Sequence, residues 1–157
     1  MIRKILGRLA AVRPFAFAFF ALASFAVSAF DTPYLTFRSA ASFSLSVSSP
    51  KWDGKIEYST DTENWTEWNG SSISAALSDG QYRLYLRGEN NTNLNGGNYS
   101  GWSLTGSNVY CEGDIEALRD YNGNPPAMAA NCCRYMFSGQ SALVSAPSLS
   151  ATTLNRT

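Results

Sequence analysis

The side chains best suited to chemistry lie between Lys55 and Trp68, where carboxylates alternate with tryptophans. Asp61, Glu63 and Glu67 are near enough in sequence to supply the paired carboxylates that glycoside hydrolysis requires. Carboxylate-rich hairpin turns are ordinary, however, and their acids are usually solvated. We therefore predict a polar turn in which none of these residues is catalytic.

The chain contains no histidine, which removes much of the usual catalytic and metal chemistry. Ser-His-Asp and Cys-His nucleophiles are excluded, and so are metal sites with imidazole ligands. The cysteines are Cys111, Cys132 and Cys133, and three thiols without histidine match no zinc site. We expect no metal, no cofactor and no enzymatic activity.

The tryptophans are the better candidates for ligand binding, because their rings can stack on sugars. The four are Trp52, Trp65, Trp68 and Trp102. Tryptophans in a small β-domain more often fill the core. Trp65 and Trp68 are three positions apart, so a regular strand directs them to opposite faces. We expect Trp65 inside and Trp68 outside. The candidate ligand-binding residues are Trp68, Trp52 and Asn69.

Short strands joined by polar turns must position these side chains. Apolar and polar residues alternate in a series of segments, a pattern typical of half-buried antiparallel strands. The predicted strands are 34–38, 42–47, 55–58, 65–68, 73–77, 81–87 and 102–105, and Ser49-Pro50 closes the first pair. About seven short strands at this spacing predict a mainly β fold, a small antiparallel, Ig-like β-sandwich.

The first 29 residues predict export and contribute nothing to the fold. Basic residues precede an uncharged apolar segment at 15–27, and Val27-Ser28-Ala29 fits the small-x-small cleavage pattern. We expect a signal peptide that is cleaved after Ala29. The alternative is an uncleaved anchor, but the apolar run is at the short end for a bilayer. The protein is then secreted or cell-surface, and contacts the membrane only transiently through this segment.

Removal of the signal peptide makes the chain acidic. Four of the 12 basic residues and none of the 12 acidic ones lie in it, so the mature chain has 8 basic and 12 acidic groups, a net charge of −4. The remaining cations are scattered, whereas phosphate binding needs clustered cations. We therefore expect no nucleic acid among the partners.

The pattern changes after Gly106. Asp114 is expected to cap a short helix that carries Ile115 and Leu118. The run Asn122-Gly123-Asn124-Pro125-Pro126 then ends the helix. The predicted organisation is a signal peptide at 1–29, a β-sandwich-like domain at 30–107, a linker with a short helix at 108–127, and a distinct unit at 128–157.

The odd number of cysteines leaves two interpretations open. In an exported chain, one disulfide from Cys111 to Cys132 or Cys133 would tie the tail to the β-domain and add about 3 kcal/mol by loop closure. Alternatively, all three cysteines are small buried hydrophobes.

The tail resembles one repeat of the BspA-like leucine-rich-repeat bacterial surface proteins. The resemblance rests on Tyr135-x-Phe137-x-Gly139, Leu143-x-x-Ala146-Pro147-x-Leu149 and Ala151-Thr152-Thr153-Leu154, with Gln140 and Ser150 where Cys and Pro are usual. Tyr58-Ser59-Thr60-Asp61 through Trp65, and Leu84-Tyr85-Leu86-Arg87-Gly88, resemble the β-domain that often precedes such repeats. The resemblance implies an exported, non-catalytic protein for adhesion or ligand binding, whose partner is a host or cell-surface protein or a glycan.

A single leucine-rich repeat cannot bury its own apolar edge, and about three or more are needed for a stable solenoid. We therefore expect that the chain is a fragment, or that Leu143, Leu149 and Leu154 pack back on the β-domain. The functional alternative to adhesion is a secreted carbohydrate-binding module that uses exposed tryptophans.

Overall fold

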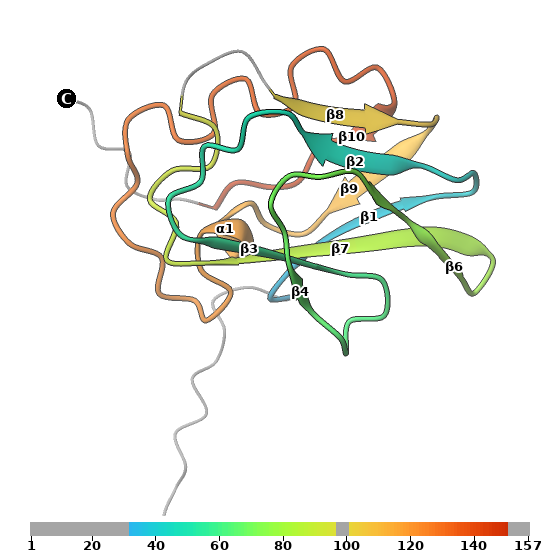
Figure 1. The fold of residues 1–157 in the computed structure, drawn as a ribbon, viewed down its shortest axis with the longest axis horizontal. Helices are drawn as coiled ribbons and strands as arrows, with labels where there is room; N and C mark the ends of the chain where they lie inside the picture. Colours follow the sequence, from blue (N-terminus) through green and yellow to red (C-terminus); the bar gives the residue numbers. More distant parts are fainter. Residues whose placement is uncertain (1–31, 97–100, 151–157) are drawn as a thin grey trace, which may run out of the picture.

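The computed structural model describes residues 32–96 and 101–150 (Figure 1). This part of the chain is mainly β, with sheets of seven and three strands and one short helix, and it contains no repeated unit. The predicted signal peptide and Leu154 lie outside the described residues. Among the described residues, no helix is long and apolar enough to cross a bilayer.

The larger sheet is built around β7, its longest strand. In spatial order it contains β10 (Leu143–Ser145), β9 (Val109–Glu112), β1 (Leu35–Ser39), β7 (Gln81–Glu89), β3 (Lys55–Ser59) and β4 (Thr66–Glu67), and β6 (Ala76–Ser78) also pairs with β7. The smaller sheet contains β5 (Ile73–Ser74), β2 (Ser44–Val47) and β8 (Trp102–Thr105). All pairs are antiparallel except β9 with β10.

The register of the larger sheet separates an apolar face from a charged and aromatic one. Phe37 of β1 lies opposite Leu84 of β7, and both are buried. Glu57 of β3 lies opposite Arg87 of β7 on the other face. Because side chains alternate along a strand, these pairs repeat every second residue and give each face one chemical character.

One hydrophobic core collects side chains from both sheets, the helix and the tail. Its members include Phe37 from the larger sheet, Leu45 from the smaller sheet, Leu118 from the helix, and Cys132 and Met136 from the tail. The core therefore continues past residue 107, into the part of the chain where the sequence predicts a linker and a separate unit. The predicted boundaries themselves stay a prediction.

Two strand predictions need correction. The first two strands do form, but β1 and β2 are not a pair, since β1 lies between β7 and β9 and β2 lies between β5 and β8. The single strand predicted at 73–77 is two short strands, β5 and β6, which belong to different sheets. The Ala75 N–H donates to the Phe43 carbonyl at 3.0 Å as the chain passes from one sheet to the other.

The strand β9 was not predicted, although its residues alternate. Val109 and Cys111 are buried, whereas Tyr110 and Glu112 are exposed. After it comes the helix α1 (Glu116–Arg119), where the Asp114 carboxylate accepts the Glu116 N–H at 2.9 Å. The predicted short helix and the capping contact of Asp114 are therefore present.

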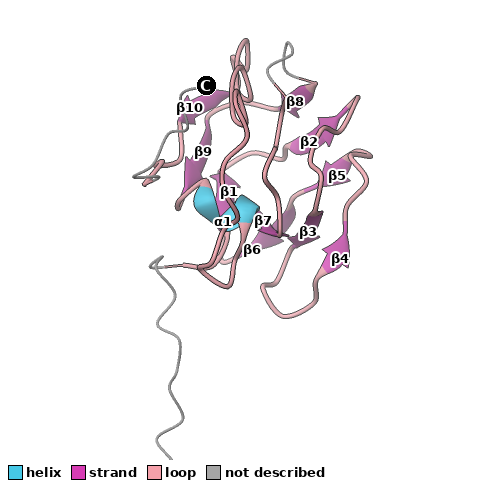
Figure 2. Ribbon diagram, turned by 90° about the vertical axis from the view of Figure 1, so that its left-hand side faces the viewer, coloured by secondary structure: helices cyan, strands magenta, loops and turns pink. Residues whose placement is uncertain are grey.

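The helix α1 lies against β7 (Figure 2). Gly88 permits this approach, because a Cβ at that position would overlap the Leu118 carbonyl oxygen. The Gly88 carbonyl also accepts the Tyr121 N–H at 2.8 Å, so the segment after the helix is fastened to the same point of the sheet. The glycine thus joins the sheet to the first part of the tail.

Candidate functional site

The predicted ligand-binding tryptophans lie together, but as part of the core. Trp68 is 2% exposed, stacks on Trp52 with ring centroids 5.4 Å apart, and meets Trp102 edge to face at 5.6 Å. Its indole N–H donates to the Ser71 carbonyl at 2.7 Å. Asn69 is exposed, and its side chain accepts the Ser71 N–H within the turn.

The expectation that Trp68 lies outside is therefore wrong, and so is the expectation that Trp65 lies inside, since Trp65 is half-buried. The two-residue alternation fails because the regular strand β4 contains only Thr66 and Glu67. The Trp68 N–H bonds to the Ile56 carbonyl at 2.8 Å as the chain turns back over the core. Trp52 is half-buried and packs against the same core, and any ligand contact of these residues stays a prediction.

Trp65 belongs to a stack of rings on the charged face of the larger sheet, which we call the Arg87 stack. The Arg87 guanidinium lies 4.2 Å from the Trp65 ring centroid and 4.3 Å from that of Tyr121. Tyr34 extends the group, with its ring 5.9 Å from Trp65. The only indication of this site in the sequence was the outward position of Arg87 in the predicted strand at 81–87. Its ring partners, Trp65 and Tyr121, lie in loops that are distant from Arg87 along the chain.

Ion pairs hold the Arg87 stack in place. Glu57 accepts hydrogen bonds from Arg87 at 2.7 Å and from Lys55 at 2.6 Å. Burial acts to raise the pKa of Glu57, but the hydrogen bonds from Lys55 and Arg87 outweigh it and lower the pKa below its ordinary value. Arg87 therefore uses both its charge and its planar face within the fold.

Asp61 organises the predicted polar turn. One of its carboxylate oxygens accepts the N–H groups of Glu63 and Asn64 at 2.9 and 2.8 Å, and the other accepts the Asn64 side-chain amide at 2.8 Å. The side-chain hydrogen bond from Asn64 is the largest cause of a strongly lowered pKa of Asp61. Both oxygens thus serve the turn, which agrees with the polar-turn interpretation. The prediction that the protein is not an enzyme stays a prediction.

The tail forms a surface concavity, which we call the tail groove. Its volume is about 340 Å³, and it is lined by Ile115, Cys133 and residues 135–138 and 146–149. Tyr135 and Leu149 are 40% and 51% exposed beside it. Phe137 anchors the groove from below, since its ring lies 5.9 Å from that of Trp102 and 6.4 Å from that of Phe37.

Backbone hydrogen bonds attach the far wall of the tail groove to the sheet. The Ile115 N–H donates to the Ser148 carbonyl and the Ser148 N–H donates to the Gly113 carbonyl, both at 2.9 Å. Leu143 packs against the core, whereas Leu149 does not. Of the leucines expected to pack back on the β-domain, Leu143 does so and Leu149 stays at the surface.

The three cysteines are free in this structure, and no bridge joins Cys111 to the tail. Cys111 and Cys132 are 1% exposed, which fits the alternative of small buried hydrophobes. Burial raises the pKa of the Cys111 thiol. The Cys133 thiol donates to the Cys132 sulfur at 3.5 Å, and this contact lowers the pKa of Cys132 and raises that of Cys133.

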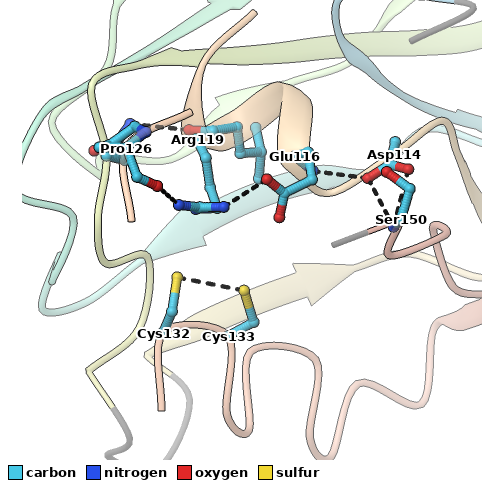
Figure 3. A network of polar contacts seen from close by, with 9 residues as sticks. Asp114, Glu116, Arg119, Pro126, Cys132, Cys133 and Ser150 are labelled. Atoms are coloured by element: carbon cyan, nitrogen blue, oxygen red, sulfur yellow. Dashed lines mark hydrogen bonds and ion pairs between the residues drawn. The ribbon is translucent and has the colours of Figure 1, made fainter. Parts of the chain in front are cut away.

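A buried ion pair lies beside the two adjacent cysteines (Figure 3). The Arg119 guanidinium donates to the Glu116 carboxylate at 2.5 Å, and also to the Pro126 carbonyl. Both charged side chains are less than 5% exposed, and burial raises the pKa of Glu116 even though Arg119 opposes it. Such a pair costs desolvation free energy, and removal of one partner leaves the other charge uncompensated.

No group of three or more Cys, Asp or Glu side chains in residues 32–96 and 101–150 is arranged to hold a metal ion. Comparison with protein-family models, curated proteins and solved structures finds no match to this chain. The candidate functional sites of the described residues are therefore the Arg87 stack, the tail groove and the cysteine pair.

Proposed function

We propose that this is an exported, non-catalytic cell-surface protein that binds a partner protein through the tail groove. The observation that carries the proposal is an apolar groove of about 340 Å³ beside exposed Tyr135 and Leu149. Exposed apolar surfaces of this kind mark interaction sites, and aromatic anchors dominate binding energy. The motif ending at Ala29 supports export, and the resemblance of the tail to BspA-like repeats supports adhesion.

We also propose that the fold is an Ig-like β-sandwich, because the two sheets share one core. Apart from Ile115, the tail groove is lined by residues between Cys133 and Leu149, and from Tyr135 on this segment resembles a leucine-rich repeat. An apolar edge is what an isolated repeat leaves exposed. The adhesion surface and the repeat-like segment are thus one part of the molecule.

Adhesion of cells that display the full chain tests the proposal. Cells are applied to a panel of immobilised host and cell-surface proteins, and the variant Tyr135→Ser/Leu149→Ser is compared with the wild type. A buried leucine contributes about 1.5–3 kcal/mol, and about 1.4 kcal/mol is a tenfold change in affinity. We expect the double variant to lower the apparent affinity about tenfold or more.

Leu77→Ser is the matched control, because Leu77 is 63% exposed on β6, outside the tail groove. Adhesion should persist in this control. Equal adhesion of the double variant and the wild type contradicts the proposal, and so does absence of adhesion to every protein of the panel. Export is tested separately, since a mature chain that starts far from Phe30 excludes cleavage after Ala29.

A carbohydrate-binding module is the second candidate, now centred on Trp65. Its half-buried ring lies near Tyr34, and the exposed Asn64 is adjacent. A glycan array separates the two proposals: Trp65→Ala should abolish glycan binding, and Tyr135→Ser/Leu149→Ser should leave it unchanged. Trp68→Ala is unsuitable for this test, because Trp68 is buried and its loss disturbs the core.

A further inference from the structure

The backbone around Cys132 and Cys133 is held firmly on both sides. The Cys132 N–H donates to the Ala129 carbonyl at 3.2 Å, and the Cys132 carbonyl accepts the Asn95 N–H at 2.7 Å. The two sulfur atoms lie 3.5 Å apart, and Cys133 is half-buried. The fold thus presents two adjacent thiols in a fixed arrangement, at a site that adjoins the tail groove through Cys133.

The same geometry disfavours a disulfide between the two residues. Consecutive Cα atoms across a trans peptide are about 3.8 Å apart, below the range of about 4.4–6.8 Å that disulfides adopt. A bridge between neighbours is therefore strained, and strained bridges are easily reduced. The fold favours the dithiol.

A methionine lies beside the two cysteines. The turn from Ala129 to Cys132 follows directly after Met128, and Met128 lines a cavity of about 190 Å³ together with both cysteines. Met128 and Cys133 are partly buried and pack against the core. Three residues with sulfur-containing side chains therefore contribute to the wall of one cavity.

A buried ion pair lies beside the two thiols. Arg119 favours negative charge on the sulfur atoms and Glu116 opposes it, and Figure 3 shows the two side chains paired beside the sulfur atoms. One monovalent cation held by two thiolates carries a net charge of −1. The Arg119 guanidinium is the positive group close to that charge, and its bond to Glu116 keeps it in position.

We propose that Cys132 and Cys133 bind one monovalent copper ion, Cu(I), with the Met128 thioether as a third ligand. Thiolates and thioethers are the ligands that select this soft ion. Two sulfur atoms 3.5 Å apart subtend an angle of roughly 100° at a metal about 2.3 Å from each, the length of a zinc–thiolate bond. Zn²⁺ needs about four ligands, and the described residues offer no such set.

Binding forms two copper–thiolate bonds and releases two thiol protons, and no atom changes oxidation state. Cu(I) accepts low coordination numbers, so the three sulfur atoms suffice without histidine or carboxylate. Cys111 takes no part, because it is fully buried in the β9 strand of the core.

The test is a titration of the reduced full chain with Cu(I), without oxygen and in competition with a chromogenic Cu(I) chelator. We expect one equivalent to bind and X-ray absorption to show a shell of sulfur only. Cys132→Ser and Cys133→Ser should each lower the affinity about 100-fold or more, and Met128→Leu about tenfold, as losses of metal-site groups do. Thermal unfolding checks that each variant is folded.

Cys111→Ser is the matched control, because it also removes one thiol and should leave the affinity unchanged. Three results would overturn the proposal. The first is that the protein retains no Cu(I). The second is that Cys111→Ser lowers the Cu(I) affinity as much as Cys132→Ser and Cys133→Ser do, and the third is that Zn²⁺ binds more tightly than Cu(I).

Discussion

The Arg87 stack and the tail groove are both aromatic surfaces, but they differ in how their side chains are used. Arg87 contacts two rings and a carboxylate within the fold, whereas Tyr135 and Leu149 remain largely exposed to solvent. In the Arg87 stack, the guanidinium and the rings contact one another and Glu57 of the larger sheet. The tail groove keeps apolar area available for a partner, so exposed rings alone do not identify a binding site.

The secondary structure around the two surfaces differs as well. The Arg87 stack lies on the paired strands β3 and β7, while the tail groove is formed by turns that a few backbone hydrogen bonds attach to the sheet. Trp102 joins the core to the tail groove, because its ring meets those of Trp68 in the core and Phe137 beneath the groove.

Trp102→Ala should produce the largest loss of stability. The ring is 2% exposed and packs edge to face against Trp68 in the core and Phe137 in the tail, so the change affects the core and the tail together. We expect the free energy of unfolding to fall by about 3–5 kcal/mol. Urea denaturation measures it. A loss below about 1 kcal/mol would show that the tail and the sheets do not depend on this contact.

Gly88→Ala should loosen the joint between β7 and α1. The added methyl group overlaps the Leu118 carbonyl, which is backbone and cannot rotate away. We expect a loss of about 3 kcal/mol and faster hydrogen exchange in the helix. Gly80→Ala is the control, because nothing lies within 4 Å of its methyl group and only its positive φ causes strain, about 1 kcal/mol. Equal effects of the two changes would exclude the close approach as the cause.

Arg87→Met tests whether the Arg87 stack is structural. The change keeps the aliphatic stem but removes the contacts with Trp65, Tyr121 and Glu57. We expect a loss of about 1 kcal/mol in chemical denaturation. Arg83→Met, on the same face of β7, is the comparison and should cost less. If Arg87→Met leaves the free energy of unfolding unchanged but abolishes binding of a partner, the stack serves recognition.

Asp61 should make the turn sensitive to acid. Its pKa is lowered in the folded state, so its stabilising contribution is present above the unfolded pKa of about 3.9 and is lost as the pH falls through the folded value. The difference in Tm between the wild type and Asp61→Asn should therefore be positive near neutrality and shrink toward pH 2. A difference that does not vary with pH would contradict the assignment.

Leu149→Ser should have the smallest effect on stability, within about 0.5 kcal/mol, because the side chain is half exposed. It should nevertheless weaken adhesion, which is the signature of a surface kept for a partner. Calorimetry and the adhesion assay on the same variant provide the two measurements. A loss of stability comparable with that of Gly88→Ala would place Leu149 in the architecture instead.

Local alternation was sufficient to predict most strands but not their partners. Leu45 and Val47 are buried as their pattern predicts, and Asp61 forms the predicted polar turn at the surface. Which sheet a strand joins is not local, however, since β1 pairs with residues far along the chain. The strand β9 was missed because a four-residue alternation is too short to stand out from a loop.

The candidate surfaces were harder to predict than the strands. From the sequence we expected Trp65 inside and Trp68 outside, whereas Trp68 is buried and Trp65 is half-buried. The expectation failed because side chains alternate between faces only within a regular strand, and β4 contains only Thr66 and Glu67. The partners of Arg87 and the cavity beside Met128 depend on loops that meet only in space. No local sequence pattern indicates such long-range contacts.

Composition and neighbouring residues were enough to predict the β character, the short helix after Asp114, the absence of histidine chemistry and the adjacency of Cys132 and Cys133. The burial of each aromatic side chain and the extension of the core into the tail became visible only in the folded chain. These outcomes depend on long-range packing, where free energy is gained from surfaces that distant segments bury together.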